Sequence, residues 1–216
     1  MRTSPKNSNI FEWKSQEELI PYLEAMKWME NRVQSLQKGE ASPCVWFLEH
    51  PPLYTLGSRG KDEDIFSSAK LPVFKSGRGG QVTYHGPGQR IVYLMIDLKS
   101  HYEDIRRYVH AVEGWIINTL HYFGVKGERR EGRVGIWVQK EGRDSKIAAL
   151  GVRVQKWVTS HGFALNLSPD LKAYDDIIPC GLSQYGVTSL QDLGIVVSME
   201  EVDALLRQTC PFDPCA

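Results

Sequence analysis

The chain of 216 residues has no excess of charge of either sign, because 26 lysines and arginines balance 26 aspartates and glutamates. The chain as a whole therefore offers no electrostatic attraction to nucleic acid or to a membrane surface. Its longest apolar run, residues 91–96, is too short to span a bilayer. Residues 1–8 contain no apolar segment, so we expect no signal peptide and a cytoplasmic location.

Cysteine is scarce, and its spacing is not that of metal sites. The four cysteines are Cys44, Cys180, Cys210 and Cys215, and no CxxC or HxxxH pattern supplies further ligands. We therefore expect no metal site. We also expect no cofactor, and we interpret the tail from Cys210 as frayed. Repeats and linkers are also missing, which predicts one domain over residues 1–216, with about ten N-terminal and about eight C-terminal residues peripheral to it.

Hydrophobic spacing predicts an α+β fold, because helical segments alternate irregularly with clustered strands. Ser15–Glu18 has the pattern of a capping box, which predicts a helix over residues 15–38, although Pro21 favours a later start. The side chains expected to lie on its one apolar face are Leu19, Leu23, Met26, Val33 and Leu36. Further helices are predicted over 103–123 and from Ser198, which begins a second capping box. Strands are predicted over 44–49, 54–56, 71–74, 91–96, 134–138, 146–154 and 157–167.

Residues 76–89 read Ser-Gly-Arg-Gly-Gly-Gln-Val-Thr-Tyr-His-Gly-Pro-Gly-Gln. Glycine lets another molecule approach the backbone closely, and a surface hairpin needs only one or two glycines. Here five glycines surround Arg78, Thr83, Tyr84 and His85. Because strands are predicted on both sides, this segment is a candidate binding loop on a rigid sheet. A glycine-rich connector without a ligand is the alternative.

Two more residues are candidates for chemistry. Cys180 lies between Pro179 and Gly181, and it is either a reactive thiol or a small buried hydrophobic residue. Lys146 begins the predicted strand 146–154 and is followed by small apolar residues. It is either an exposed charge at a sheet edge or a desolvated ammonium that assists a thiol. Spacing alone does not join residues 146 and 180, so the residues themselves indicate a ligand-binding α+β domain with a candidate cysteine.

Six segments in their order along the chain resemble the signature blocks of the lipoyl (octanoyl) transferases. They are residues 48–57, 78–89, 146–151, 161–166, 179–181 and 186–190. The resemblance implies the fold of the biotin and lipoate protein ligase catalytic domains, a mixed β-sheet flanked by helices. It also implies that Cys180 is a nucleophile that carries the octanoyl group as a thioester, and that Lys146 is the residue paired with it.

The same resemblance implies a set of substrate-binding residues. They are Arg78, Gly79, Gly80, Gln81, Val82, Thr83, Tyr84, His85, Ala149, Leu150, Gly151, Gly162, Phe163 and Ala164. The implied donor is octanoyl-acyl carrier protein. The implied acceptors are lipoyl domains of 2-oxoacid dehydrogenase complexes and the glycine cleavage H protein, with no nucleic acid or membrane partner.

Docking of an acidic carrier protein needs a local basic patch, because the chain is neutral overall. The candidates are Arg78, Arg106, Arg107, Arg129, Arg130 and Arg133. Two other functions remain open at this point. One is an ATP-dependent lipoate or biotin ligase, which needs no cysteine, and the other is a non-catalytic acyl-binding protein.

Overall fold

The computed structural model describes residues 11–100, 103–178 and 185–212. Its large sheet contains β1 (Glu12–Leu19), β2 (Cys44–Glu49), β6 (Gln89–Met95), β7 (Glu128–Arg130), β8 (Arg133–Lys140), β9 (Arg143–Gln155), β10 (Val158–Asn166) and β11 (Gly186–Val187). The strand order is β1-β2-β6-β10-β9-β8-β7, and β11 pairs with β9. A smaller sheet of order β4-β3-β5 contains β3 (Leu53–Leu56), β4 (Val73–Lys75) and β5 (Val82–His85).

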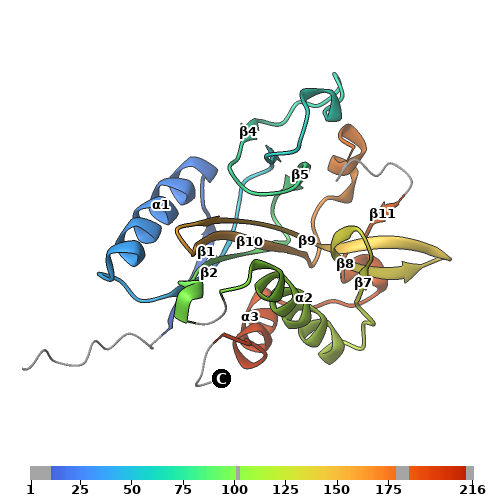
Figure 1. The fold of residues 1–216 in the computed structure, drawn as a ribbon. Helices are drawn as coiled ribbons and strands as arrows, with labels where there is room; N and C mark the ends of the chain where they lie inside the picture. Colours follow the sequence, from blue (N-terminus) through green and yellow to red (C-terminus); the bar gives the residue numbers. More distant parts are fainter. Residues whose placement is uncertain (1–10, 101–102, 179–184, 213–216) are drawn as a thin grey trace, which may run out of the picture.

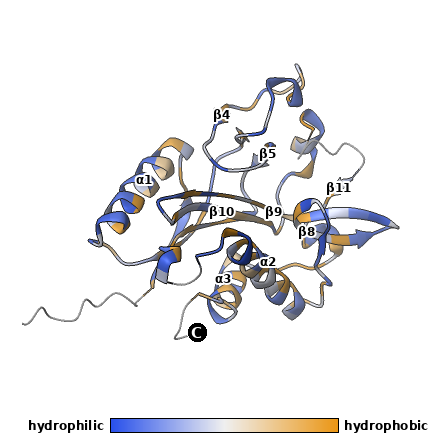
Figure 2. Ribbon diagram, in the orientation of Figure 1, coloured by the Kyte–Doolittle hydropathy of each residue, from blue (hydrophilic) through white to orange (hydrophobic). Residues whose placement is uncertain are grey.

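Helices cover both faces of the large sheet (Figure 1). One face carries α1 (Tyr22–Lys38), and the other carries α2 (Ile105–Tyr122) and α3 (Met199–Gln208). Figure 2 shows hydrophobic and hydrophilic residues alternating along α1, as expected for a helix with one buried face. The predicted α+β fold, a mixed sheet flanked by helices, is confirmed. No helix among the described residues is long and apolar enough to cross a bilayer.

The helix predicted over residues 15–38 is wrong in its first part. Residues 12–19 form β1, which pairs in parallel with β2, and α1 begins only at Tyr22, directly after Pro21. Leu23, expected inside, is 65% exposed, whereas Ala25 and Met29 are buried. A capping pattern is a local signal, but β1 is fixed by backbone pairing with a distant strand. The second capping box is confirmed, since Ser198 Oγ accepts a hydrogen bond from Glu201 N (3.2 Å).

Three smaller expectations also need correction. The glycine-rich segment is not one loop, because residues 82–85 form β5 and pair with β3. Lys146 lies inside a strand and not at its beginning, because β9 starts at Arg143. The tail is not frayed at Cys210 or Phe212, which are both buried, and the Phe212 ring packs against Tyr108 with 5.5 Å between ring centroids. Residues 213–216 lie outside the described residues.

Candidate active site

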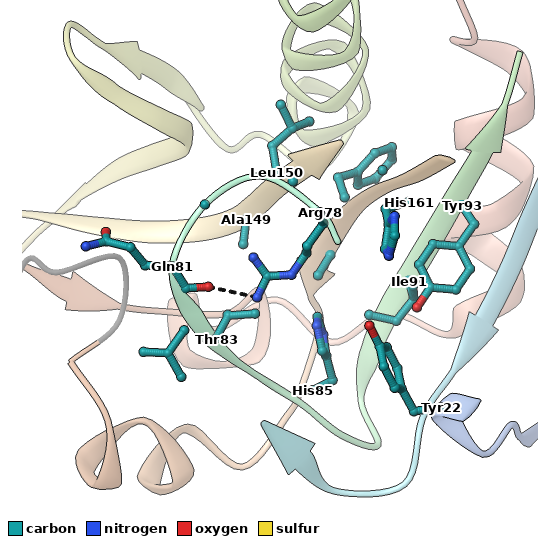
Figure 3. A pocket seen from close by; sticks show the side chains of 16 residues that line it. Tyr22, Arg78, Gln81, Thr83, His85, Ile91, Tyr93, Ala149, Leu150 and His161 are labelled. Atoms are coloured by element: carbon teal, nitrogen blue, oxygen red, sulfur yellow. Dashed lines mark hydrogen bonds between the residues drawn. The ribbon is translucent and has the colours of Figure 1, made fainter. Parts of the chain in front are cut away.

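A cavity, here called the central cavity, lies where the loop of residues 76–81 crosses the middle of the large sheet (Figure 3). Its empty volume, open solvent included, is about 520 Å³. Its lining residues are Tyr22, Arg78, Gly80, Gln81, Val82, Thr83, His85, Ile91, Tyr93, Ala149, Leu150, Gly151, His161, Gly162, Phe163 and Ala164.

Of the fourteen residues expected to bind substrate, all but Gly79 and Tyr84 line the central cavity. The Tyr84 side chain lies on the side of β5 opposite to those of Thr83 and His85, because side chains alternate along a strand. Its ring packs against the rings of Tyr54 and Tyr174 at 6.0 and 5.5 Å between centroids. Gly79 donates its N–H to Val152 O (3.0 Å), so it is engaged in holding the loop against β9.

Four cavity residues were not predicted as site residues, namely Tyr22, Ile91, Tyr93 and His161. Ile91 and Tyr93 share one face of β6, and their alternation within the apolar run 91–96 was a usable signal. His161 begins one of the segments that resemble the family blocks. Tyr22 follows Pro21 and gave no signal, because only the packing of α1 onto the sheet brings it to the cavity.

Arg78 holds the glycine-rich loop against the smaller sheet. Its guanidinium donates to Thr55 Oγ1 from Nε (3.2 Å) and Nη2 (2.7 Å) and to Thr55 O (2.8 Å). It also donates to Gly79 O and to Gln81 O, both at 2.9 Å, and Figure 3 shows the bond to Gln81. Gly80 in this loop has a φ of 91°, which side-chain-bearing residues rarely adopt. The loop therefore has one defined shape, fixed by a buried cation.

Three buried histidines, His50, His85 and His161, lie in and beside the central cavity and are called the histidine cluster. Burial lowers the pKa of His50 to about 4. Burial, together with the charges of His50 and Arg78, lowers the pKa of His85 to about 3. Burial and the Arg78 charge also lower the pKa of His161 to about 3. The histidine cluster is therefore neutral at pH 7 and adds no positive charge to the cavity. Ile91, Leu150 and Phe163 also line the cavity, which therefore suits an apolar group better than an anion.

A second cavity, here called the Lys146 cavity, adjoins the first. The two share Gly80, Gln81, Leu150 and Gly151 as lining residues. Lys146 is only 7% exposed, and its Nζ lies 4.6 Å from the centre of the Trp137 ring. The alternative of an exposed edge charge is therefore wrong. The Lys146 ammonium is held over the face of the Trp137 indole and is shielded from most solvent. It is therefore positioned for proton transfer to a group bound in the Lys146 cavity.

Cys180 and its neighbours Pro179 and Gly181 lie outside the described residues. The described residues before and after this segment are held by contacts with the rest of the protein. Ile178 N donates to Asp64 O (2.8 Å), and Val187 is paired with Lys146 in the sheet. The Tyr185 ring packs on Trp137, with centroids 5.5 Å apart. Tyr185, which follows Cys180 by five residues in the sequence, therefore lies beside the same indole ring as the Lys146 ammonium.

Four of the six arginines expected to form a basic patch, namely Arg78, Arg129, Arg130 and Arg133, are engaged with other parts of the protein. Arg129 pairs with Glu113 (3.0 Å), and Arg130 and Arg133 both pair with Asp144 (3.0 and 2.8 Å). Arg78 is buried in the loop. The exposed Arg59, which was not among these candidates, lines the Lys146 cavity together with Arg133. Among the described residues, no cluster of His, Cys, Asp or Glu side chains could hold a metal ion.

Comparisons with known proteins agree with this geometry. Residues 21–210 match the family described as the lipoyl protein ligase A/B catalytic domain. The chain is 49% identical to an octanoyltransferase of Cereibacter sphaeroides, with 93% of this chain and 96% of that protein covered. It is also 49% identical to an octanoyltransferase of Rhodospirillum rubrum, with 94% and 96% covered.

Solved structures give the fold. A lipoate-protein ligase A bound with ATP superposes with a TM-score of 0.72 at 18% identity, over 92% of this chain and 83% of that one. A bipartite lipoate protein ligase from Thermoplasma acidophilum gives a TM-score of 0.70 at 15% identity, over 93% and 82%. The expected likeness to the lipoate ligase fold is therefore confirmed.

Proposed function

This chain belongs to the octanoyltransferase family, and we propose that it transfers octanoyl from octanoyl-acyl carrier protein to one lysine of a lipoyl domain. Lipoyl domains of 2-oxoacid dehydrogenase complexes and the glycine cleavage H protein are the acceptors. The observation that carries the proposal is the apolar central cavity, which adjoins the cavity of a buried lysine. Residues 1–216 act as one catalytic domain, which the match over 21–210 supports.

Cys180 is the nucleophile of the first half-reaction. Its thiolate attacks the carbonyl carbon of the carrier thioester, a new carbon–sulfur bond forms, and the bond to the carrier sulfur breaks. Lys146 as an ammonium favours the thiolate and gives one proton to the departing carrier thiol. One thioester replaces another, so the step needs no external energy source. Gly79 N–H is already used by Val152 O, so the loop N–H groups of Gly80 and Gln81, which line both cavities, are the ones that bind the thioester oxygen.

The second half-reaction forms the amide. Lys146, now neutral, takes one proton from the incoming lysine ammonium, whose nitrogen then attacks the acyl-Cys180 carbonyl. The amide bond forms, the Cys180 thiolate leaves, and the second amine proton passes to solvent. Both protein groups return to their starting states. Transfer from a thioester to an amine is downhill, so no ATP is consumed.

The reaction also favours a cytoplasmic location, because Cys180 must stay reduced to act as a nucleophile. The described cysteines, Cys44 and Cys210, are free thiols, which is consistent with a reducing compartment.

The test is transfer without ATP. Octanoyl-acyl carrier protein, an unmodified lipoyl domain and this protein are mixed, and the intact mass of the lipoyl domain is measured. We expect the gain of one octanoyl group, and none on a lipoyl domain whose acceptor lysine is replaced by arginine. Transfer only from free octanoate with ATP would identify a ligase. Octanoyl binding without transfer would identify an acyl-binding protein.

A further inference from the structure

The central cavity lies between two others. It shares Gly80, Gln81, Leu150 and Gly151 with the Lys146 cavity. It shares Tyr22 and His161 with a third cavity between α1 and the end of the β9–β10 hairpin, here called the α1 cavity. Figure 3 shows Gln81 on one side of the central cavity and Tyr22 and His161 on the opposite side. The three cavities therefore follow one another in a line.

This arrangement gives an acyl chain a direction, provided that the proposed function holds. The reacting carbonyl belongs at the end next to Lys146. The chain then runs past Leu150 and through the central cavity, and its terminal methyl group points toward Tyr22 and His161. We propose that Tyr22 and His161 form an end wall that sets the length of the transferred acyl chain.

Both side chains of this end wall are held from several directions. The Tyr22 ring packs against His50 and Phe74, with centroids 5.5 and 5.2 Å apart. His161 Nε2 lies 3.2 Å from Ser76 Oγ, and the His161 ring meets Tyr93 edge to face at 6.0 Å. Both residues are buried. Displacement of the wall by extra methylene groups would therefore break contacts with His50, Phe74, Ser76 and Tyr93.

The backbone is also distorted where His161 enters the wall. His161 has a φ of 60°, in the left-handed region that favours glycine, although it lies inside β10. Strained backbone of this kind persists where the surrounding structure needs one particular side-chain placement.

Space for a longer chain exists behind the wall. Met26, Met29 and Val33 of α1 line the α1 cavity and offer apolar contacts, while Arg153 and Lys156 lie on its other side. Removal of the wall would join the central and α1 cavities. The same protein would then accept acyl chains that extend past His161 onto the Met26 side.

The test uses His161→Gly, because glycine accepts a φ of 60° and removes the imidazole. Transfer of octanoyl and dodecanoyl groups from acyl carrier protein to a lipoyl domain is compared as kcat/KM. We expect the dodecanoyl-to-octanoyl ratio to rise about tenfold or more, the scale on which apolar pockets discriminate added methylenes. Tyr22→Ala should act in the same direction. Gln37→Ala, which changes only the α1 cavity, is the matched control and should leave the ratio unchanged.

Two further measurements keep the test decisive. Met26→Trp in the His161→Gly background should refill the α1 cavity and return the ratio toward that of the wild type. In the wild-type protein, octanoate should raise the melting temperature more than dodecanoate does at equal concentration. If the ratio stays unchanged in both His161→Gly and Tyr22→Ala, or if dodecanoate stabilises the wild type as well as octanoate does, the end wall is refuted. Failure of wild-type octanoyl transfer would instead refute the proposed function.

Discussion

Replacement of Arg78 by methionine removes the group that fixes the glycine-rich loop. Methionine keeps much of the side-chain length but makes none of the five hydrogen bonds to Thr55, Gly79 and Gln81. Hydrogen bonds to a charged group contribute about 1.5–3 kcal/mol each when taken alone. The sum of five such contributions would exceed the total free energy of unfolding of many domains, so they are not additive. Removal of the guanidinium also removes the free-energy cost of burying its charge, which reduces the net loss.

The net loss expected is about 3–5 kcal/mol, because the buried acceptors of Thr55, Gly79 and Gln81 lose their donor at about 1–3 kcal/mol each, and the cost of burying the guanidinium is subtracted from that sum. For a chain of this size, that corresponds to a fall in melting temperature of roughly 6–20 °C. The measurement is urea unfolding at pH 7, followed by circular dichroism. Arg143→Met is the matched control, because Arg143 is exposed and its replacement should change the free energy of unfolding by no more than about 0.5 kcal/mol.

The same variant changes the electrostatics of the cavity. The Arg78 charge helps to lower the pKa values of His85 and His161, so both should rise when it is absent. NMR titration of the histidine ring protons measures this change. If Arg78→Met loses less than about 1 kcal/mol of stability, about the worth of one ordinary hydrogen bond, and leaves both titrations unmoved, then Arg78 does not hold the loop as described.

Three further predictions follow from the site. Lys146→Ala should lower kcat for octanoyl transfer about 100-fold or more and slow alkylation of the Cys180 thiol, and unchanged values of both would remove Lys146 from the chemistry. Each histidine of the cluster has a pKa of about 6.5 in the unfolded chain and a lower pKa in the folded protein, so the unfolded chain binds more protons below pH 6.5. The free energy of unfolding should therefore fall from pH 6.5 toward pH 4. The loss at pH 5 should reach about 2 kcal/mol per histidine in urea unfolding, whereas a flat profile would contradict the neutral cluster. Arg59→Glu should raise KM for octanoyl-acyl carrier protein, and the increase should be smaller at high salt. The control Lys27→Glu on α1 should leave this KM unchanged. If Arg59→Glu has the same KM as the wild type, the carrier protein docks elsewhere.

The sequence predicted best where a signal is local or where several segments keep their order. The capping box at Ser198 and the strand at 44–49 depend on nearby residues, and both were found. The segments around Arg78, Leu150 and Phe163 were predicted to form one substrate-binding site only because of their resemblance to one family. The structure brings these three residues together at the central cavity.

The rest depended on contacts between distant parts of the chain. Residues 12–19 carry the signature of a helix start but form a strand, because β2 offers a free edge for parallel pairing. Tyr22 reaches the cavity only through the packing of α1 on β6 and β10. Arg129 looked like a free charge, because its acidic partner Glu113 lies 16 residues away in sequence. No single-residue pattern encodes such pairings.

Peptide mapping of the acyl-enzyme by mass spectrometry tests the central claim most directly. The protein is incubated with octanoyl-acyl carrier protein in the absence of a lipoyl domain, digested and mapped. One octanoyl group should appear on Cys180, should be released by hydroxylamine, and should pass to a lipoyl domain added afterwards. Cys180→Ala should form no adduct and transfer nothing. An adduct on Cys44, or full turnover by Cys180→Ala, would contradict the account.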